Sequence, residues 1–423
     1  MTKEKCKRSN QSVFIQRIVL LHMLFGMLAA DLGCAGKGLL AEKYPGQFYR
    51  VSKLGPNELM NENPQFIVYG DARSGWRLEE KFLLKRNWLT WKMLIFPFYE
   101  LYWLGNGFVG GFNVLRRKPD YGIRERRMVR DGVYNEAKRS KVDFILNTGD
   151  MLPDGRRPSH WAGFLQENKS EQPLLVDFPH ISVIGNHERG NDSTYGLRNY
   201  EAVFGYPRFF VRDFQNAALF ILDSNVILDQ YHLLDDDKQD ELFQEWFYSG
   251  NPEQPAWLER ELAARDKTFK MVAMHHPPIS FNKHHGDWEQ EDWGNNLQEK
   301  RRQLIGLFQE QGVQIVFSGH EHVYEHNVVR YNLDGNLPDG EIHFIVSGGA
   351  GVPLRDATLH SKMAGFVQNY RDQGFDARSL QQEKVYHYCL VEINHDRVKI
   401  EAIEVTGDPA QPSKSIEQIL IRE

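Results

Sequence analysis

The chain has 423 residues, 41% of them hydrophobic, which is enough for one large α/β domain or two small ones. Its formal net charge is −6 and it has no block of like charge, so general nucleic-acid binding through a basic patch is not expected. With only three cysteines, a disulfide framework is not expected either.

Residues 1–36 have the layout of a secretory signal peptide: basic residues, an apolar run that starts at Ile18, and then small residues. The apolar run is short for a membrane span, which needs about 20 residues, and Asp31 disfavours one. An uncleaved N-terminal membrane anchor is an alternative. Cys34 gives a faint resemblance to a bacterial lipoprotein processing site, which is the less favoured interpretation. All three predict a periplasmic or extracellular domain, or one tethered to a membrane.

The remaining sequence is predicted to comprise a linker at 37–62, one main domain at 63–408 and a C-terminal tail at 409–423. An insertion at about 84–116 is crowded with aromatic residues over 88–112. We expect this insertion to pack on the flank of the domain. Contact with a membrane surface, where tryptophan and tyrosine are favoured, is the alternative.

The main domain begins with short apolar, β-branched runs that are typical of buried strands. The first, Phe66–Tyr69, is followed by Asp71, and the second, Val142–Leu146, by Asp150. An aspartate directly after a buried strand lies where α/β sheets bind their ligands. A turn aspartate that accepts from its own backbone is the alternative for Asp71.

Three later strand-like runs, at 180–184, 270–274 and 313–317, also end in side chains that can bind a metal. Imidazole is the commonest nitrogen ligand of divalent metals, although a single histidine is more often a core or surface residue. Five strand ends with oxygen or nitrogen donors, and without cysteine, predict a catalytic metal site rather than a structural zinc site. The donors at the three later ends are Asn186 with His187, His275, and His320 with His322.

Strands alternate with helices at first and follow one another later, which indicates an α/β protein with helices outside a mixed sheet system. The motifs Gly-Asp-x-Arg, Gly-Asp, Gly-Asn-His-Glu, Met-His-His-Pro and Gly-His-x-His occur in this order between residues 66 and 405. This order resembles the calcineurin-like metallophosphoesterase superfamily, which includes the purple acid phosphatases. The resemblance implies a four-layer α/β/β/α sandwich, in which two mixed β-sheets are flanked by helices.

The resemblance also implies two divalent or trivalent metal ions, with zinc, manganese or iron as candidates. His187 would lie beside the ions rather than on them. The ligands would be Asp71, Asp150 and His322 at the first site, and Asp150, Asn186, His275 and His320 at the second site.

The sequence departs from the family pattern at two positions of the first site. The commonest first motif is Asp-x-His, but this chain has Arg73, and arginine cannot ligate a metal. The purple enzymes place a metal-bound tyrosine three residues after the bridging aspartate, where this chain has Pro153, so a coloured tyrosinate–iron centre is not expected. Arg73 would instead hold a substrate phosphate oxygen, or form a salt bridge to a ligating carboxylate.

The function implied is hydrolysis of a small phosphomonoester or phosphodiester, with a lipid-linked ester as one alternative, by attack of a hydroxide that bridges the two ions. His187 would assist the leaving group, and Glu188 or another carboxylate would orient it. His276 would lie behind the ligands. His284 and His285 could reach the substrate, but they are more simply surface loop residues. The rival function is that of a membrane-tethered binding protein that is inactive or weakly active on the same fold. A zinc metalloprotease is disfavoured because the chain has no His-Glu-x-x-His helix.

Overall fold

The computed structural model describes twelve parts of the chain. The predicted signal peptide or anchor at 1–36 and the aromatic insertion at 84–116 lie outside the described residues. The described residues are 38–44, 51–52, 63–73, 123–168, 172–190, 193–225, 253–289, 291–292, 295–331, 340–356, 360–407 and 413–423.

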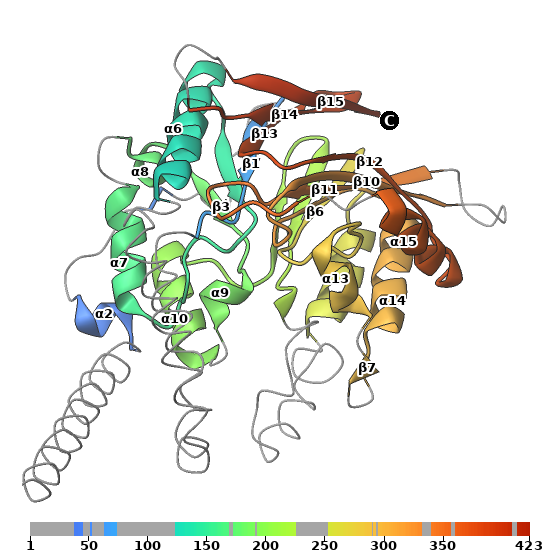
Figure 1. Cartoon of the computed structure of the whole chain (residues 1–423), viewed down its shortest axis with the longest axis horizontal. Coiled ribbons are helices and arrows are strands. Elements are labelled where there is room, and N and C mark those ends of the chain that lie inside the picture. Colours follow the sequence, from blue (N-terminus) through green and yellow to red (C-terminus); the bar gives the residue numbers. More distant parts are fainter. Residues whose placement is uncertain are drawn as a thin grey trace, which may run out of the picture.

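Two β-sheets stack on one another, with helices on both outer faces (Figure 1). The first sheet has the order β15-β14-β13-β1-β2-β3, in which β1, β2 and β3 are parallel and the other pairs antiparallel. Its strands are β1 (Gln65–Tyr69), β2 (Phe144–Asn147), β3 (His180–Ser182), β13 (His387–Ile393), β14 (Arg397–Glu404) and β15 (Lys414–Arg422).

The second sheet has the order β12-β10-β11-β9-β6-β5-β4 and is also mixed. Its four central strands, β11, β9, β6 and β5, are parallel, and antiparallel strands flank them. The strands are β4 (Phe210–Asp213), β5 (Ala217–Ile221), β6 (Phe269–Ala273), β9 (Val313–Ser318), β10 (Tyr324–Tyr331), β11 (Gly340–Ser347) and β12 (Asp376–Glu383).

Helices lie on both sides of the sheet pair. On the side of the first sheet Figure 1 shows α6, α7, α8 and α10, and on the side of the second α13, α14 and α15. The described helices are α2 (Leu40–Lys43), α6 (Ile123–Ser140), α7 (Pro158–Glu167), α8 (Leu174–Asp177), α9 (Asn186–Arg189), α10 (Ser193–Phe204), α13 (Glu253–Ala263), α14 (Leu297–Glu310) and α15 (His360–Asp372), with a 3₁₀ helix at Lys283–Trp288 and a two-stranded ribbon of β7 (Glu291–Asp292) and β8 (Asn295–Asn296).

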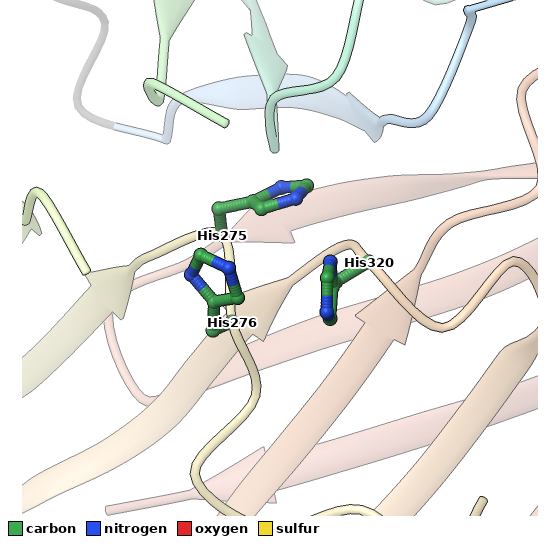
Figure 2. A group of neighbouring side chains, drawn as sticks. All are labelled: His275, His276 and His320. Atoms are coloured by element: carbon green, nitrogen blue, oxygen red, sulfur yellow. The ribbon is translucent and has the colours of Figure 1, made fainter. Parts of the chain in front are cut away.

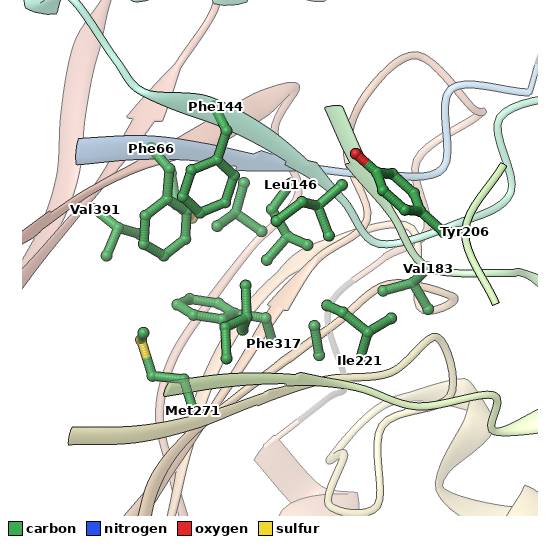
Figure 3. Close-up of a cluster of buried hydrophobic side chains, with 14 of the residues drawn as sticks. Phe66, Phe144, Leu146, Val183, Tyr206, Ile221, Met271, Phe317 and Val391 are labelled. Carbon is green, nitrogen blue, oxygen red and sulfur yellow. The ribbon is translucent and has the colours of Figure 1, made fainter. Parts of the chain in front are cut away.

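The core between the sheets explains why the central strands are apolar throughout. Phe66 in β1 stacks on Phe144 in β2, with ring centroids 4.6 Å apart, and meets Phe317 of the opposite sheet edge-on at 6.0 Å (Figure 3). The alternate residue Ile67 faces away from this core and packs with Val129 and Val133 of α6. Because both faces of such a strand are covered, neither face is polar. The predicted four-layer α/β/β/α architecture is confirmed.

The prediction of a C-terminal tail at 409–423 is wrong for the strand that it contains. β15 pairs along its length with β14, and Ile419 and Ile421 are buried in the core between the sheets. Two alternate isoleucines among polar residues make a strand that covers an edge of the first sheet. Part of the predicted linker also packs on the domain: Leu40 in α2 is buried, and its N–H donates to Asn199 Oδ1 at 2.7 Å.

Candidate metal centre

The predicted metal ligands follow strands whose carboxyl ends meet at one edge of the two sheets. β1, β2 and β3 are parallel neighbours, as are β6 and β9, and such ends are where α/β sheets bind ligands. Backbone hydrogen bonds join the loops: Asp71 N–H donates to Gly149 O at 2.9 Å, and Gly319 N–H to His275 O at 3.0 Å. The structure brings together all the predicted ligands, which are Asp71, Asp150, Asn186, His275, His320 and His322.

The backbone is strained at four of these ligands. The φ angles are 60° at Asp71, 53° at Asp150, 72° at His320 and 55° at His322, and Lys141 is the one further non-glycine residue with positive φ in the described ranges. This left-handed conformation is uncommon for residues with a side chain and is typical of functional sites. The left-handed backbone sets the direction of these four side chains.

The second site is ordered around His275. The Nδ1–H of this fully buried histidine donates to Thr148 O at 2.8 Å, which leaves the Nε2 lone pair for the centre. Nε2 lies 3.1 Å from Asn186 Oδ1 and 3.3 Å from Asp150 Oδ1. Donors that each lie about 2.1 Å from one metal ion are separated by distances of this order. The donor set therefore fits a divalent ion.

His320, the remaining predicted ligand of the second site, follows β9. Its Nε2–H donates to Asp287 Oδ2 at 2.9 Å, so Nδ1 is the nitrogen able to ligate. Its backbone N–H donates to Asp71 Oδ2 at 2.7 Å. Figure 2 shows the rings of His275, His276 and His320 close together after β6 and β9, and one nitrogen of each lies within 4.8 Å of the others. The Nδ1 of His276 is 2.9 Å from Ser224 Oγ, which holds this ring beside the ligands.

The first site contains its three donors but also a cation. His322 Nε2 is 3.6 Å from Asp71 Oδ1, and both Asp71 Oδ1 and Asp150 Oδ2 are buried. Arg73 reaches into this group: its Nε is 3.1 Å from Asp150 Oδ2, and its Nη2 is 3.3 Å from His322 Nε2. The expected salt bridge between Arg73 and a ligating carboxylate is present. The first site as it stands does not fit a metal ion, because two of its three donors face the guanidinium.

Burial and neighbouring charges shift the pKa values of the acids at the centre in opposite directions. Burial raises the pKa of Asp71 to about 8, and the Asp150 carboxylate adds to the effect. Burial also acts on Asp150, but the charges of His187, His275 and Arg73 hold its pKa well below the usual value. Asp150 is therefore the carboxylate that is ionised most readily, as a ligand must be.

His187 lies beside the centre, whereas Glu188 binds backbone N–H groups and does not contact His187 through its carboxylate oxygens in the way predicted. The Nδ1–H of His187 donates to Pro153 O at 2.6 Å, and its Nε2 is 3.8 Å from Asp150 Oδ2. The prediction that Glu188 orients this ring is wrong, since its two oxygens turn inward and accept from four backbone N–H groups. These groups belong to Asp150, Met151, Leu152 and Gly185, at distances of 2.7 to 3.2 Å.

Sequence reasoning missed Asp287 and misjudged the histidines near it. Asp287 Oδ2 accepts from both His320 and His284, the latter at 2.8 Å. The ring of His284 packs on that of His320, with centroids 3.9 Å apart, and His285 is buried against Tyr370. The prediction of two surface loop histidines is therefore wrong. The spacing of three residues between His284 and Asp287, which suits one turn of a 3₁₀ helix, was the available signal.

Two stacked mixed sheets, with aspartate, asparagine and histidine donors at adjacent strand ends, define a metallophosphoesterase type of protein. The model of the calcineurin-like phosphoesterase family matches residues 126–324. The fold also matches a purple acid phosphatase from yellow lupin (TM-score 0.51, 15% identity, 86% of this chain and 54% of that one) and PhoD (TM-score 0.54, 10% identity, 87% and 71%). Residues 126–324 of the chain therefore match the calcineurin-like phosphoesterase superfamily, and the purple acid phosphatase relatives support the same superfamily.

Relatives in sequence are named purple acid phosphatases. Purple acid phosphatase 17 of Arabidopsis thaliana is 25% identical over 252 residues, which cover 55% of this chain and 67% of that protein. Purple acid phosphatase 4 of the same plant is 24% identical over 272 residues, covering 58% and 72%. A third relative, named probable inactive purple acid phosphatase 27, is 25% identical over 250 residues, but only 38% of its length is covered.

Proposed function

We propose that this chain is a metal-dependent phosphoesterase that hydrolyses a small phosphomonoester or phosphodiester. The observation that carries the proposal is the second site, where His275 Nε2 lies 3.1 Å from Asn186 Oδ1 and 3.3 Å from Asp150 Oδ1. One nitrogen of His320 lies within 4.8 Å of one of His275. The phosphatase names of its relatives support the same reaction class.

A divalent ion held at the second site would lower the pKa of a bound water and polarise the phosphoryl oxygens. The chain supplies the orientation of the donors: Thr148 fixes the His275 tautomer and Asp287 that of His320. In its doubly protonated form, His187 would donate the Nε2 proton to the leaving oxygen and keep its Nδ1–H on Pro153 O.

The second ion expected from the superfamily would need Asp71, Asp150 and His322. Arg73 competes for two of these donors. The proposal of phosphoester hydrolysis therefore rests on the second site alone.

The decisive experiment combines metal analysis with a substrate screen. The purified chain is reconstituted with zinc, manganese or iron and assayed on 4-nitrophenyl phosphate, bis(4-nitrophenyl) phosphate and pyrophosphate. We expect hydrolysis with at least one metal, and loss of both metal and activity in the His275→Ala variant. A chain that binds metal and hydrolyses no ester in the screen would overturn the proposal.

The rival function, a membrane-tethered binding protein without turnover, gains one observation from a relative whose name includes "probable inactive". It needs export and membrane contact, for which 1–36 and 88–112 are the candidate segments. None of the helices in the described ranges combines the length and the apolar composition that a membrane crossing requires. Co-sedimentation with liposomes tests the rival: binding that is unchanged after Trp91→Ser, Phe96→Ser and Trp103→Ser removes 88–112 as the contact.

A further inference from the structure

We infer that the guanidinium of Arg73 takes the place of the metal ion at the first site, so that the centre works with one ion, held at the second site. The inference rests on the proposed function only in that it assumes a metal at the second site. It departs from the two-ion arrangement that the superfamily resemblance implies.

Arg73 and a metal ion at the first site would compete for the lone pair of His322 Nε2. A neutral imidazole nitrogen that accepts a hydrogen bond uses the same electron pair that it would give to a metal. Nη2 of Arg73 lies 3.3 Å from His322 Nε2 and is always a donor, because the guanidinium stays protonated. His322 therefore serves Arg73 or an ion, but not both.

The two oxygens of Asp150 divide between the two sites. Oδ1 lies 3.3 Å from His275 Nε2 and accepts the backbone N–H of His187 at 3.0 Å. Oδ2 lies 3.1 Å from Arg73 Nε. In a two-ion centre this second oxygen would bind the first ion. Here it faces a fixed positive charge, so the carboxylate bridges one metal position and one guanidinium.

Asp71, the remaining donor of the first site, already accepts a hydrogen bond from the second site. Asp71 Oδ2 accepts the backbone N–H of His320 at 2.7 Å, which positions a ligand of the second site. The backbone that carries Arg73 is fixed as well, since its N–H donates to Asp150 O at 3.0 Å. The side chain is only 18% exposed. Arg73 therefore enters the centre from a backbone that is itself hydrogen-bonded to a residue of the centre.

The arrangement has a chemical consequence. A guanidinium can offset the negative charge of a phosphoryl oxygen, as an ion does, but it cannot lower the pKa of a water by coordination. Nη1 of Arg73 lies 3.5 Å from His187 Nδ1, so this charge is beside the predicted proton donor. Activation of water therefore falls to the ion at the second site, and Arg73 contributes charge and orientation.

Metal stoichiometry tests the inference directly. After reconstitution with excess manganese or zinc and desalting, elemental analysis is expected to find about one equivalent per unaltered chain. The Arg73→His variant, which restores the usual Asp-x-His motif, is expected to bind about two equivalents and to show the spin coupling of paired manganese ions. Arg73→Lys retains a positive charge and is expected to stay near one equivalent.

Matched variants separate position from charge. Arg355 also lies at the centre, where its Nη1 donates to His320 O at 3.1 Å, but it contacts no donor atom of the first site. The Arg355→Ala variant is therefore expected to stay near one equivalent. His322→Ala is expected to leave the metal content unchanged in the unaltered background, and to lower it from about two equivalents to one in the Arg73→His background. Circular dichroism spectra and thermal midpoints of all variants identify any that fail to fold.

The metal content distinguishes failure of the inference about Arg73 from failure of the proposed function. Two equivalents in the unaltered chain, one of them lost in His322→Ala, would overturn the inference and leave the phosphoesterase proposal intact. One equivalent in both the unaltered chain and Arg73→His would show that Arg73 is not what excludes the ion. A folded chain that takes up no metal under any condition would overturn both proposals.

Discussion

Asp287 links a ligand of the second site to the 3₁₀ helix that carries His284. The carboxylate accepts from His320 Nε2 and from His284 Nδ1, so both rings have their orientation set by one residue. An arrangement of carboxylate, histidine and metal raises the basicity of the ligating nitrogen and fixes its direction. Neither effect needs contact between the carboxylate and the ion.

Asp287→Asn is expected to weaken metal binding at the second site. The amide keeps the shape but loses the charge, so metal affinity should fall roughly 10–100-fold. Competition with a chromogenic chelator measures the change. The control is Asp372→Asn, an exposed aspartate at the end of α15 whose side chain bonds to Gln368. Equal affinities of the two variants would remove the orienting role of Asp287.

His187→Ala is expected to lower turnover to an extent that depends on the leaving group of the ester. A proton donor matters most when the leaving group is a poor one, so hydrolysis of an alkyl ester should fall by about 10²–10⁴-fold, and that of a 4-nitrophenyl ester far less. Turnover of the two esters is compared at saturating metal, with metal content measured alongside as the control. Parallel losses on both esters would contradict the proton-donor role.

Among the elements, β15 contributes more than its place at the end of the chain suggests. It covers the edge that β14 would otherwise expose, and its buried isoleucines enter the core between the sheets. Tyr324 OH and His326 Nδ1–H of β10 both donate to Glu417 of this strand, at 2.7 and 2.8 Å. β15 therefore ties the second sheet to the first.

Truncation after residue 412 is expected to destabilise the whole domain. Burial of each isoleucine contributes about 1.5–3 kcal/mol, so the loss from Ile419 and Ile421 alone is several kcal/mol. Urea denaturation of the truncated and full-length chains measures the difference. Substitution of Leu420, whose side chain is exposed on the same strand, by Ser is the matched control and should change stability little. An unchanged midpoint after truncation would show that the strand is dispensable.

For the molecule as a whole, the sequence predicts the architecture. It also predicts that the proposed ligands lie near one another, because each of them follows an apolar strand. The contact of Arg73 with His322 and the contact between Asp287 and His320 could not be predicted in this way. Both depend on how loops far apart in the chain meet, and Arg73 has a long side chain that can point in several directions. β15 was missed because only two of its residues are buried.

Stability should decrease as the solution becomes acidic. Burial lowers the pKa of both His180 and His387 to about 4, although each Nδ1–H bonds to a backbone carbonyl. In the unfolded chain a histidine has a pKa of about 6.5. As the pH falls from about 6.5 to 4, the unfolded state therefore binds protons that the folded state does not, and up to about 3 kcal/mol per histidine is lost.

Urea denaturation at pH 7 and pH 5 measures this loss. The double variant His180→Gln, His387→Gln should lose less stability between the two pH values than the unaltered chain, whatever its stability at pH 7. The same loss in both proteins would show that other groups determine the acid sensitivity.

The left-handed backbone at Asp71, Asp150, His320 and His322 means that the candidate metal centre lowers the stability of the fold. Each such residue costs of order 1–3 kcal/mol, and glycine or asparagine would adopt the same conformation more easily. A chain that lost these ligands to glycine would keep its two sheets with less strain. Glycine at these four positions would therefore relieve backbone strain and remove the predicted metal donors at the same time.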